Sequence, residues 1–107
     1  MEIVSFENFK KLEIRIGKII SAETVKSSNK LLKLQVDFGV EKRQILAGIA
    51  KFYEPDALVG KLCPFVFNLA SKMMGDIESQ GMMLCADDNG PVLLHPDKEV
   101  KAGSSIK

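Results

Sequence analysis

The 107-residue sequence contains one histidine, two cysteines and no tryptophan, and these shortages limit the chemistry that it can support. Cys63 and Cys85 lie far apart and form no CxxC pair, and His95 belongs to no HExxH motif, so no zinc site is predicted. GxSxG, Walker-type and GxGxxG loops are also missing. We therefore expect no metal, no cofactor and no enzymatic activity.

Long apolar segments are missing as well. No run approaches the roughly 20 residues that a membrane span needs. The first residues, Met1 to Ser5, lack the basic region and the long apolar stretch of a signal peptide. Two cysteines make no disulfide framework, and we expect reduced thiols in the core. These features predict a cytoplasmic protein without a membrane partner.

The composition that remains is that of one globular domain spanning residues 1–107, with 46% apolar and 27% charged residues. The charge is unevenly distributed. Residues 26–72 carry eight basic and four acidic side chains, whereas residues 73–107 carry three basic and six acidic ones. A basic middle segment is a plausible surface for an anionic partner. A solvated basic face without a partner is the other interpretation.

The first half of the chain predicts a short helix followed by three strands. Ser5 can cap a helix over residues 5–11. Apolar and polar residues alternate from Leu12, and Gly17 within that pattern predicts a bulge or bend in a strand reaching Val25. Two further strands, 32–38 and 43–47, are predicted to pair as a hairpin.

The second half predicts one helical turn and two more strands. Pro55 suits the first position of a helical turn over residues 55–59. The apolar run 62–69 predicts a fourth strand, in which Pro64 indicates an edge position or a start near Phe65. The remaining segments are predicted as a loop over 70–80, a fifth strand over 81–86, a turn over 88–91, a short strand over 92–95 and a polar tail.

This order predicts an all-β fold: a five-stranded Greek-key OB barrel with a short N-terminal helix and a short helix between strands three and four. Residues of about 5–86 would form the barrel, and residues 87–107 a β-rich C-terminal extension. An SH3-like barrel or another small barrel is the alternative architecture.

Basic residues concentrate where an OB barrel presents its ligand face, on strands two and three and their flanking loops. We expect these side chains to neutralise phosphates: Lys30, Lys33, Arg43, Lys51 and Lys72. Gln35 and Gln44 can bond base edges or sugars. Because this face lacks exposed aromatic residues, it predicts recognition of a shaped RNA rather than of single-stranded DNA in general.

The methionines indicate less about function than the basic residues do. Met82 is predicted to face the interior unless Met83 does. The pair Met73 and Met74 lies in the predicted loop and suits local packing, a subunit interface or contact with a base.

Several ordered blocks of the sequence match one family. They are Leu12–Ile20 (LEIRIGKII), Ser28–Leu34 (SNKLLKL), Arg43–Ala50 (RQILAGIA), Leu58–Lys61 (LVGK), Asn68–Leu69 and Glu78–Leu84 (ESQGMML). The chain resembles, over roughly residues 5 to 107, the tRNA-binding domain at the C-terminus of many methionyl-tRNA synthetases. It is similar also to freestanding structure-specific tRNA-binding proteins and to the secretion chaperone CsaA.

The resemblance implies an OB fold, a homodimer formed with the help of the C-terminal extension, and shape-directed tRNA binding beside a methionyl-tRNA synthetase catalytic chain. By position, it places these residues in the binding region: Asn29, Lys30, Arg43, Lys72, Ser79 and Met82. The chain departs from the family at Ala70–Ser71, where Lys-Pro is usual, and at Met74, where Arg is frequent. Both changes remove positive charge.

Two other functions remain open. A CsaA-like chaperone would need an exposed apolar groove, for which Phe52, Met73 and Met74 are candidates. The third hypothesis is a dimerisation module of a split synthetase.

Overall fold

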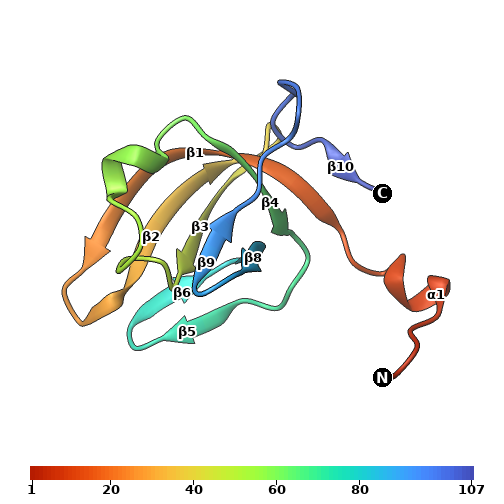
Figure 1. Cartoon of the computed structure of the whole chain (residues 1–107), viewed down its shortest axis with the longest axis horizontal. Helices are drawn as coiled ribbons and strands as arrows, with labels where there is room; N and C mark the ends of the chain where they lie inside the picture. The colour runs from red at the N-terminus through yellow and green to blue at the C-terminus, as the bar shows by residue number, and fades with distance from the viewer.

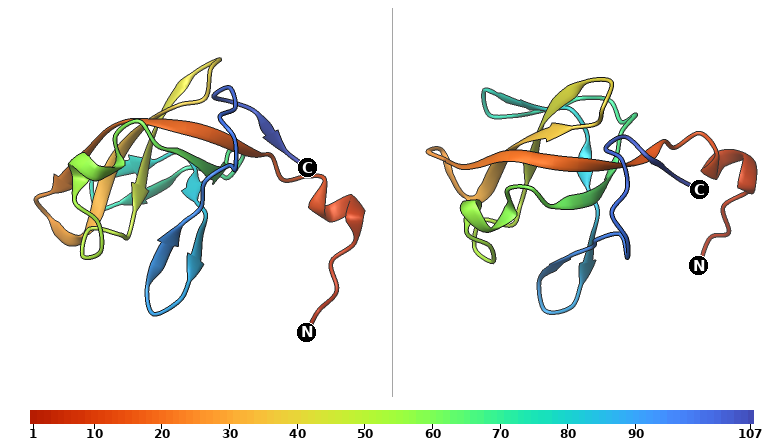
Figure 2. Two further views of the ribbon diagram at one scale, coloured as in Figure 1. Left: turned by 45° about the horizontal axis from the view of Figure 1, so that its top comes forward. Right: turned by 90° about the horizontal axis from the view of Figure 1, so that it is seen from above.

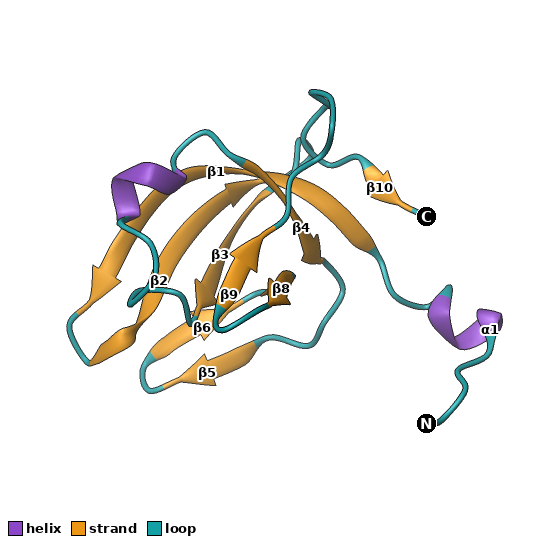
Figure 3. Cartoon of the chain, viewed as in Figure 1, coloured by secondary structure: helices purple, strands orange, loops and turns teal.

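The computed structural model describes all 107 residues, and its regular secondary structure is mainly β-strand, joined by long loops (Figures 1 and 3). Its main sheet has the strand order β3-β2-β1-β4-β7, with β10 beside β1, and two hairpins, β5-β6 and β8-β9, stand apart from it. The helical elements are α1 (Phe6–Phe9) and the 3₁₀ helix η1 (Pro55–Leu58). The strands are β1 (Ile14–Val25), β2 (Ser28–Asp37), β3 (Lys42–Ala47), β4 (Leu62–Val66), β5 (Lys72–Met74), β6 (Ile77–Ser79), β7 (Met82–Met83), β8 (Cys85–Asp87), β9 (Pro91–Leu93) and β10 (Ser105–Ile106). The prediction of an all-β chain is confirmed, and no helix has the length and apolarity that a membrane crossing demands.

The long strand β1 pairs with β10 at Ile14 and Arg15 and also has two longer ladders. Its first half pairs with β4, and the half after Lys18 pairs with β2. The expected irregularity lies at Ile20, where the register with β2 shifts, and not at Gly17. Gly17 has a different function: a Cβ there would lie 2.4 Å from Val36 Cγ1 and 2.8 Å from Phe38 Cε1. The glycine therefore lets β1 pass directly over the core side of β2.

The core lies between β1, β2, β3 and β4. The alternating residues of β2, Leu32, Leu34 and Val36, are fully buried, as the sequence predicts. Phe38 makes edge-to-face contacts with Phe65 and Phe67, with ring centroids 5.5 and 5.0 Å apart. Aromatic pairs in this geometry contribute beyond the area that they bury, so these three rings form the centre of the core.

Pro64 was predicted at an edge or before the strand start, and that prediction is wrong. Pro64 lies within β4, which runs between β1 and β7. Its carbonyl accepts a hydrogen bond from Leu84 N (3.0 Å). In an antiparallel pair, the N–H and C=O of one residue point to the same neighbour, so the missing N–H faces the β7 side. The proline is tolerated because the β4-β7 ladder ends at Phe65 and Met83.

The predicted loop 70–80 contains the β5-β6 hairpin, with Lys72 opposite Ser79 and Gly75 at positive φ in the turn. The predicted strand 81–86 is divided, because Met83 pairs with β4 whereas Cys85 pairs with β9. Figure 2 shows the two hairpins projecting from different sides of the main sheet. The C-terminal tail also forms a strand, β10, that the sequence did not predict.

The N-terminal helix is confirmed in a shorter form. Ser5 caps α1 by accepting a hydrogen bond from Asn8 N (3.1 Å). Figure 1 shows α1 lying away from the main sheet, and none of its residues is buried. Phe6 and Phe9 are 68% and 43% exposed, so this segment presents apolar surface to its surroundings.

Candidate nucleic-acid interface

A continuous row of neighbouring residues crosses the outer face of the sheet and reaches the β5-β6 hairpin. Glu23 of β1 lies opposite Lys33 of β2, and Lys33 lies opposite Leu46 of β3. Leu46 N then donates to Ser79 Oγ (3.0 Å), and Ser79 lies opposite Lys72 of β5. The fold thus brings the hairpin, far away in sequence, against the strands on which the basic face was predicted.

Lys33 is the only predicted lysine that is already neutralised. Its Nζ lies 2.7 Å from Glu23 Oε1, and its side chain is 30% exposed. An exposed ion pair of this kind contributes about 1 kcal/mol or less, so a phosphate group could displace the carboxylate. The pairing with Glu23 was not predicted, because Glu23 is ten residues earlier and becomes a neighbour only through the β1-β2 register.

The two glutamines of this face are bonded to each other. Gln35 Nε2 donates to Gln44 Oε1 (3.2 Å), and Gln44 Nε2 donates to Glu78 O (2.9 Å). Gln80 completes the contact with β3: its side-chain oxygen accepts from Gln44 N (3.1 Å), and its own N–H donates to Gln44 O (2.8 Å). These bonds attach the segment after β6 to β3, which is a role that the sequence did not indicate for Gln80.

Ser79 is 3% exposed, and its hydroxyl is used within the protein. It accepts from Leu46 N and donates to Gly81 O (3.1 Å). A direct contact with tRNA was expected from the family position alone. In this geometry the hydroxyl makes two hydrogen bonds within the protein, and Ser79 joins the hairpin to β3.

Arg43 also points away from the outer face, in phase with the core residues Ile45 and Ala47. Its guanidinium lies 3.6 Å from the centroid of Phe67, and Arg15 lies over the same ring at 4.1 Å. Arg43 Nη1 donates to Phe67 O and, at 3.5 Å, to Gln80 O. Its Nε donates to Glu41 Oε2 (2.9 Å), and this hydrogen bond holds the pKa of the Glu41 carboxyl below its ordinary value. The period-two alternation of β3 was the signal that could have placed Arg43 on the inner side.

The remaining predicted site residues are exposed: Asn29, Lys30, Lys51, Lys72 and Met82. None of them takes part in the three ion pairs of the structure. Ala50 N donates to Lys30 O (3.0 Å), which brings the loop that carries Lys51 beside the start of β2. Met83 is the methionine that enters the core, which leaves Met82 46% exposed.

Lys26 is a basic residue that the sequence analysis missed. It lines a groove of about 360 Å³ at the β1-β2 turn, together with Lys33 and with Asp76 and Ile77 from the tip of the hairpin. Its place immediately before the Ser27-Ser28-Asn29 turn was the available signal.

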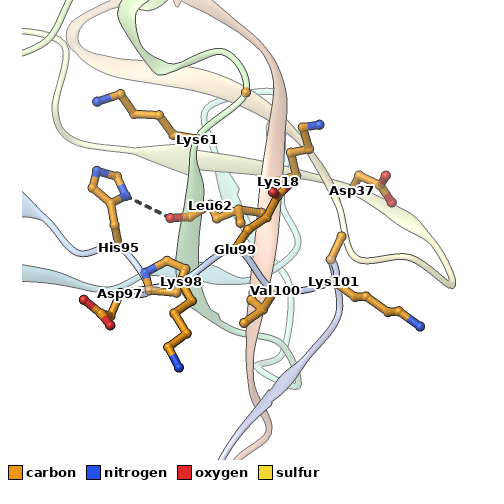
Figure 4. Close-up of a pocket in the computed structure, with 13 residues that line it drawn as sticks. Lys18, Asp37, Lys61, Leu62, His95, Asp97, Lys98, Glu99, Val100 and Lys101 are labelled. Carbon is orange, nitrogen blue, oxygen red and sulfur yellow. Dashed lines mark hydrogen bonds between the residues drawn. The ribbon is translucent and has the colours of Figure 1, made fainter.

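A second groove, of about 650 Å³, lies elsewhere (Figure 4). Its lining includes Lys18, Lys61, Lys98 and Lys101, opposed by Asp37, Asp97 and Glu99, and none of the predicted site residues. Lys18 lies opposite Asp37, at the other end of the β1-β2 ladder from the turn at Val25 and Ser28. His95 Nδ1 contacts Leu62 O (2.8 Å) at the groove wall.

No three His, Cys, Asp or Glu side chains are grouped as metal ligands. Both cysteines are free, and burial raises the pKa of the Cys63 thiol to about 11. The outer face of β2 and β3 presents lysine and amide side chains.

A comparison with known protein families identifies the family of this chain. Residues 14–105 match the model described as a putative tRNA-binding domain. The chain belongs to this family. It is a tRNA-binding domain homologous to part of the methionine–tRNA ligases. The family and its relation to methionyl-tRNA synthetases, expected from the sequence blocks, are confirmed.

The curated relatives are much longer than this chain. It is 47% identical over 110 residues to the methionine–tRNA ligase of Methanosarcina mazei and 52% identical over 106 residues to that of Methanothrix thermoacetophila. The matches cover 100% and 98% of this chain but 15% and 16% of the ligases. The matched family is a binding module, and the catalytic part of those ligases is not in this chain.

Two solved structures match the whole chain. A MetRS-related protein from Pyrococcus horikoshii superposes with a TM-score of 0.92 at 39% identity, covering 100% of both chains. The chaperone CsaA from Bacillus anthracis gives a TM-score of 0.92 at 31% identity, covering 99% of this chain and 100% of that one.

Proposed function

We propose that this tRNA-binding domain binds folded tRNA in the cytoplasm through phosphate contacts and shape, and assists a methionyl-type synthetase. The observation that carries the proposal is the group of exposed lysines without acidic partners, Lys30, Lys51 and Lys72, around the outer face of β2 and β3. Asn29 immediately precedes Lys30, Met82 is exposed on β7, and Gln35 and Lys33 lie on the face itself. Holding tRNA near the catalytic chain would raise its effective concentration there.

The proposed architecture is one domain with a closed five-stranded Greek-key barrel and a C-terminal extension. The hydrogen bonds of Gln44 with Gln80, and of Leu46 with Ser79, support closure between β3 and the segment that leads into β7. Because these bonds position the hairpin beside β3, barrel closure and the tRNA surface depend on the same contacts.

The proposed quaternary state is a homodimer. Its support is the apolar surface near the two ends of the chain, where Phe6, Phe9 and Leu12 are 43% to 68% exposed and Ile106 is 39% exposed. Large exposed apolar side chains that gather on one surface mark a site that a partner can cover. Light scattering after gel filtration should give twice the chain mass, and a single-chain mass would contradict the dimer.

The tRNA proposal is tested with two variants of equal charge. The first replaces Lys30, Lys51 and Lys72 by Gln, and the control replaces Lys18, Lys61 and Lys98, from the groove of about 650 Å³, by Gln. Fluorescence anisotropy of labelled, folded tRNA is measured between about 50 and 200 mM salt. Each contacted phosphate contributes about 0.7 to 0.9 to the slope of log affinity against log salt. Three contacts predict roughly a 20- to 40-fold weaker affinity at the higher salt for the unmodified protein.

The first variant should bind weakly and with little salt dependence, whereas the control should retain most of the affinity and slope. Equal losses in the two variants, or binding that ignores salt, would contradict the proposed surface. Weaker binding of a single-stranded DNA of the same length would support recognition by shape.

A chaperone that holds unfolded chains is the second candidate, favoured by the likeness to CsaA and by the exposure of Phe52 (55%) and Met73 (58%). An assay for suppression of the aggregation of a denatured protein distinguishes the chaperone function from tRNA binding. Suppression that persists with excess tRNA would favour the chaperone, and loss of suppression under those conditions would favour a shared tRNA surface. Co-purification with a catalytic subunit would support the synthetase-associated role.

A further inference from the structure

One guanidinium joins the two ends of the segment that carries Lys72. Arg43 Nη1 donates both to Phe67 O and to Gln80 O (3.5 Å). Phe67 immediately precedes residues 68–79, and Gln80 immediately follows them. This segment contains the β5-β6 hairpin and Lys72. Arg43, at the beginning of β3, therefore closes the base of the hairpin segment.

The surroundings of Arg43 fit an internal role better than a phosphate contact. Three of the five N–H donors of an arginine are engaged here, two by the carbonyls of Phe67 and Gln80 and one by Glu41. The guanidinium stacks on Phe67, and the side chain is only 20% exposed. A lysine could not reproduce this planar, multiply bonded arrangement.

The other bonds between β3 and this segment reach only its second half. Gln44 bonds Gln80 and the carbonyl of Glu78, and Leu46 bonds Ser79. The first half is held at Asn68, whose side chain accepts from Glu13 N (2.8 Å) and donates to Lys11 O (2.6 Å). Arg43 is thus the side chain of β3 that connects the beginning of the segment with its end.

We propose that Arg43 is a positioning residue for tRNA binding: it holds residues 68–79 so that Lys72 meets a phosphate, and it does not contact tRNA itself. This inference rests on the proposed tRNA-binding function. Under this inference, Arg43 affects the affinity for tRNA by fixing the position of Lys72.

A double-mutant cycle separates positioning from direct contact, because residues that act as one unit are not additive. The variants are Arg43→Gln, Lys72→Gln and the double variant, each titrated with folded tRNA at several salt concentrations. We expect each single variant to lose about tenfold in affinity, the low end for a hydrogen bond to a charged group. The double variant should lose no more than either single variant, with a salt slope reduced by about 0.7 to 0.9, as for one lost phosphate.

Arg43→Lys provides the second measurement, since it keeps the charge but not the forked hydrogen bonds. Positioning predicts that it binds as weakly as Arg43→Gln. A direct phosphate contact predicts near-normal tRNA affinity for Arg43→Lys. It also predicts that the losses of affinity in the two single variants multiply in the double variant, and that the salt slope falls by the amount expected for two lost phosphate contacts. Either result would overturn the inference, as would unchanged affinity in Arg43→Gln.

Arg15→Gln is the matched control, because Arg15 also stacks on Phe67 but pairs with Glu13 and makes no bond to the segment ends. It should bind tRNA within about twofold of the unmodified protein, well below the tenfold that one charged hydrogen bond contributes. Hydrogen exchange checks folding: the Arg43 variants should exchange faster in residues 68–79 and normally in β1 and β2. If the unmodified protein binds no tRNA, the proposed function itself fails. If it binds and the cycle is additive, only the role of Arg43 fails.

Discussion

Replacing Ser79 by alanine tests whether this residue holds the hairpin to the sheet. The hydroxyl makes two hydrogen bonds, accepting from Leu46 N (3.0 Å) and donating to Gly81 O (3.1 Å). Leu46 is 5% exposed and Ser79 3% exposed. Water therefore has little access to the Leu46 amide once the hydroxyl is removed.

The expected loss follows from that burial. A buried donor left without a partner costs about 1 to 3 kcal/mol, and Leu46 N has no other acceptor in the strand ladder at this position. Gly81 O loses a partner too, but Gly81 is half-buried and water can reach it more easily. We expect Ser79→Ala to lower the free energy of unfolding by about 1 to 3 kcal/mol. For a domain of this size, that is a fall in melting temperature of roughly 5 to 20 °C.

Urea unfolding followed by far-ultraviolet circular dichroism measures this difference, provided that the m-value is unchanged. Ser71→Ala is the control, because Ser71 is exposed and its side chain makes no hydrogen bond. We expect the control to lie within about 0.5 kcal/mol of the unmodified protein. If Ser79→Ala were as stable as Ser71→Ala but bound tRNA poorly, the structural role would be refuted and direct contact supported.

Three further predictions concern stability. Phe38→Ala should destabilise the fold by about 3 to 5 kcal/mol in urea unfolding, because Phe38 is 1% exposed and contacts two aromatic rings, whereas Phe52→Ala at an exposed site should cost far less. Gly103→Ala should release the C-terminal tail and speed hydrogen exchange of the Ile16 amide, because φ at Gly103 is +93° and a Cβ there would lie 2.1 Å from Phe38 O. Gly75→Ala is the control: a Cβ at Gly75 points into open space, so the Ile16 amide should stay protected. Burial raises the pKa of the Cys63 thiol to about 11, so the thiol of the unfolded chain ionises first and stability should fall as pH rises from about 9 towards 11. Urea unfolding across this range should show a smaller fall in stability for Cys63→Ala than for the unmodified protein. Equal slopes of stability against pH in the two proteins would contradict the assignment to Cys63.

The sequence predicted much of the fold because its signals are local. The alternation of Leu32, Leu34 and Val36 with polar residues is a property of one strand, and the structure buries these residues as expected. Ser5 caps a short helix, and Pro55 begins a helical turn, for equally local reasons. The family blocks, which extend over nearly the whole chain, identified the tRNA-binding domain before any contact was known.

The sequence was less informative where several strands meet. Pro64 was expected at an edge, but the point at which the β4-β7 ladder ends depends on β7, which follows much later in the chain. The strands of the β5-β6 hairpin have three residues each, which is too short for an alternating pattern to show, and contacts with β3 stabilise the hairpin.

Residue types therefore established that this chain is an all-β binding domain with a basic middle segment and without clustered catalytic groups. The tertiary structure decided which basic residues are free. Lys30, Lys51 and Lys72 remain exposed, Lys33 meets Glu23 across two strands, and Arg43 turns inward onto Phe67. The physical reason is that the charge of a side chain follows from its residue type alone. Its burial and its ion pairs depend on neighbours that only the register of distant strands brings together.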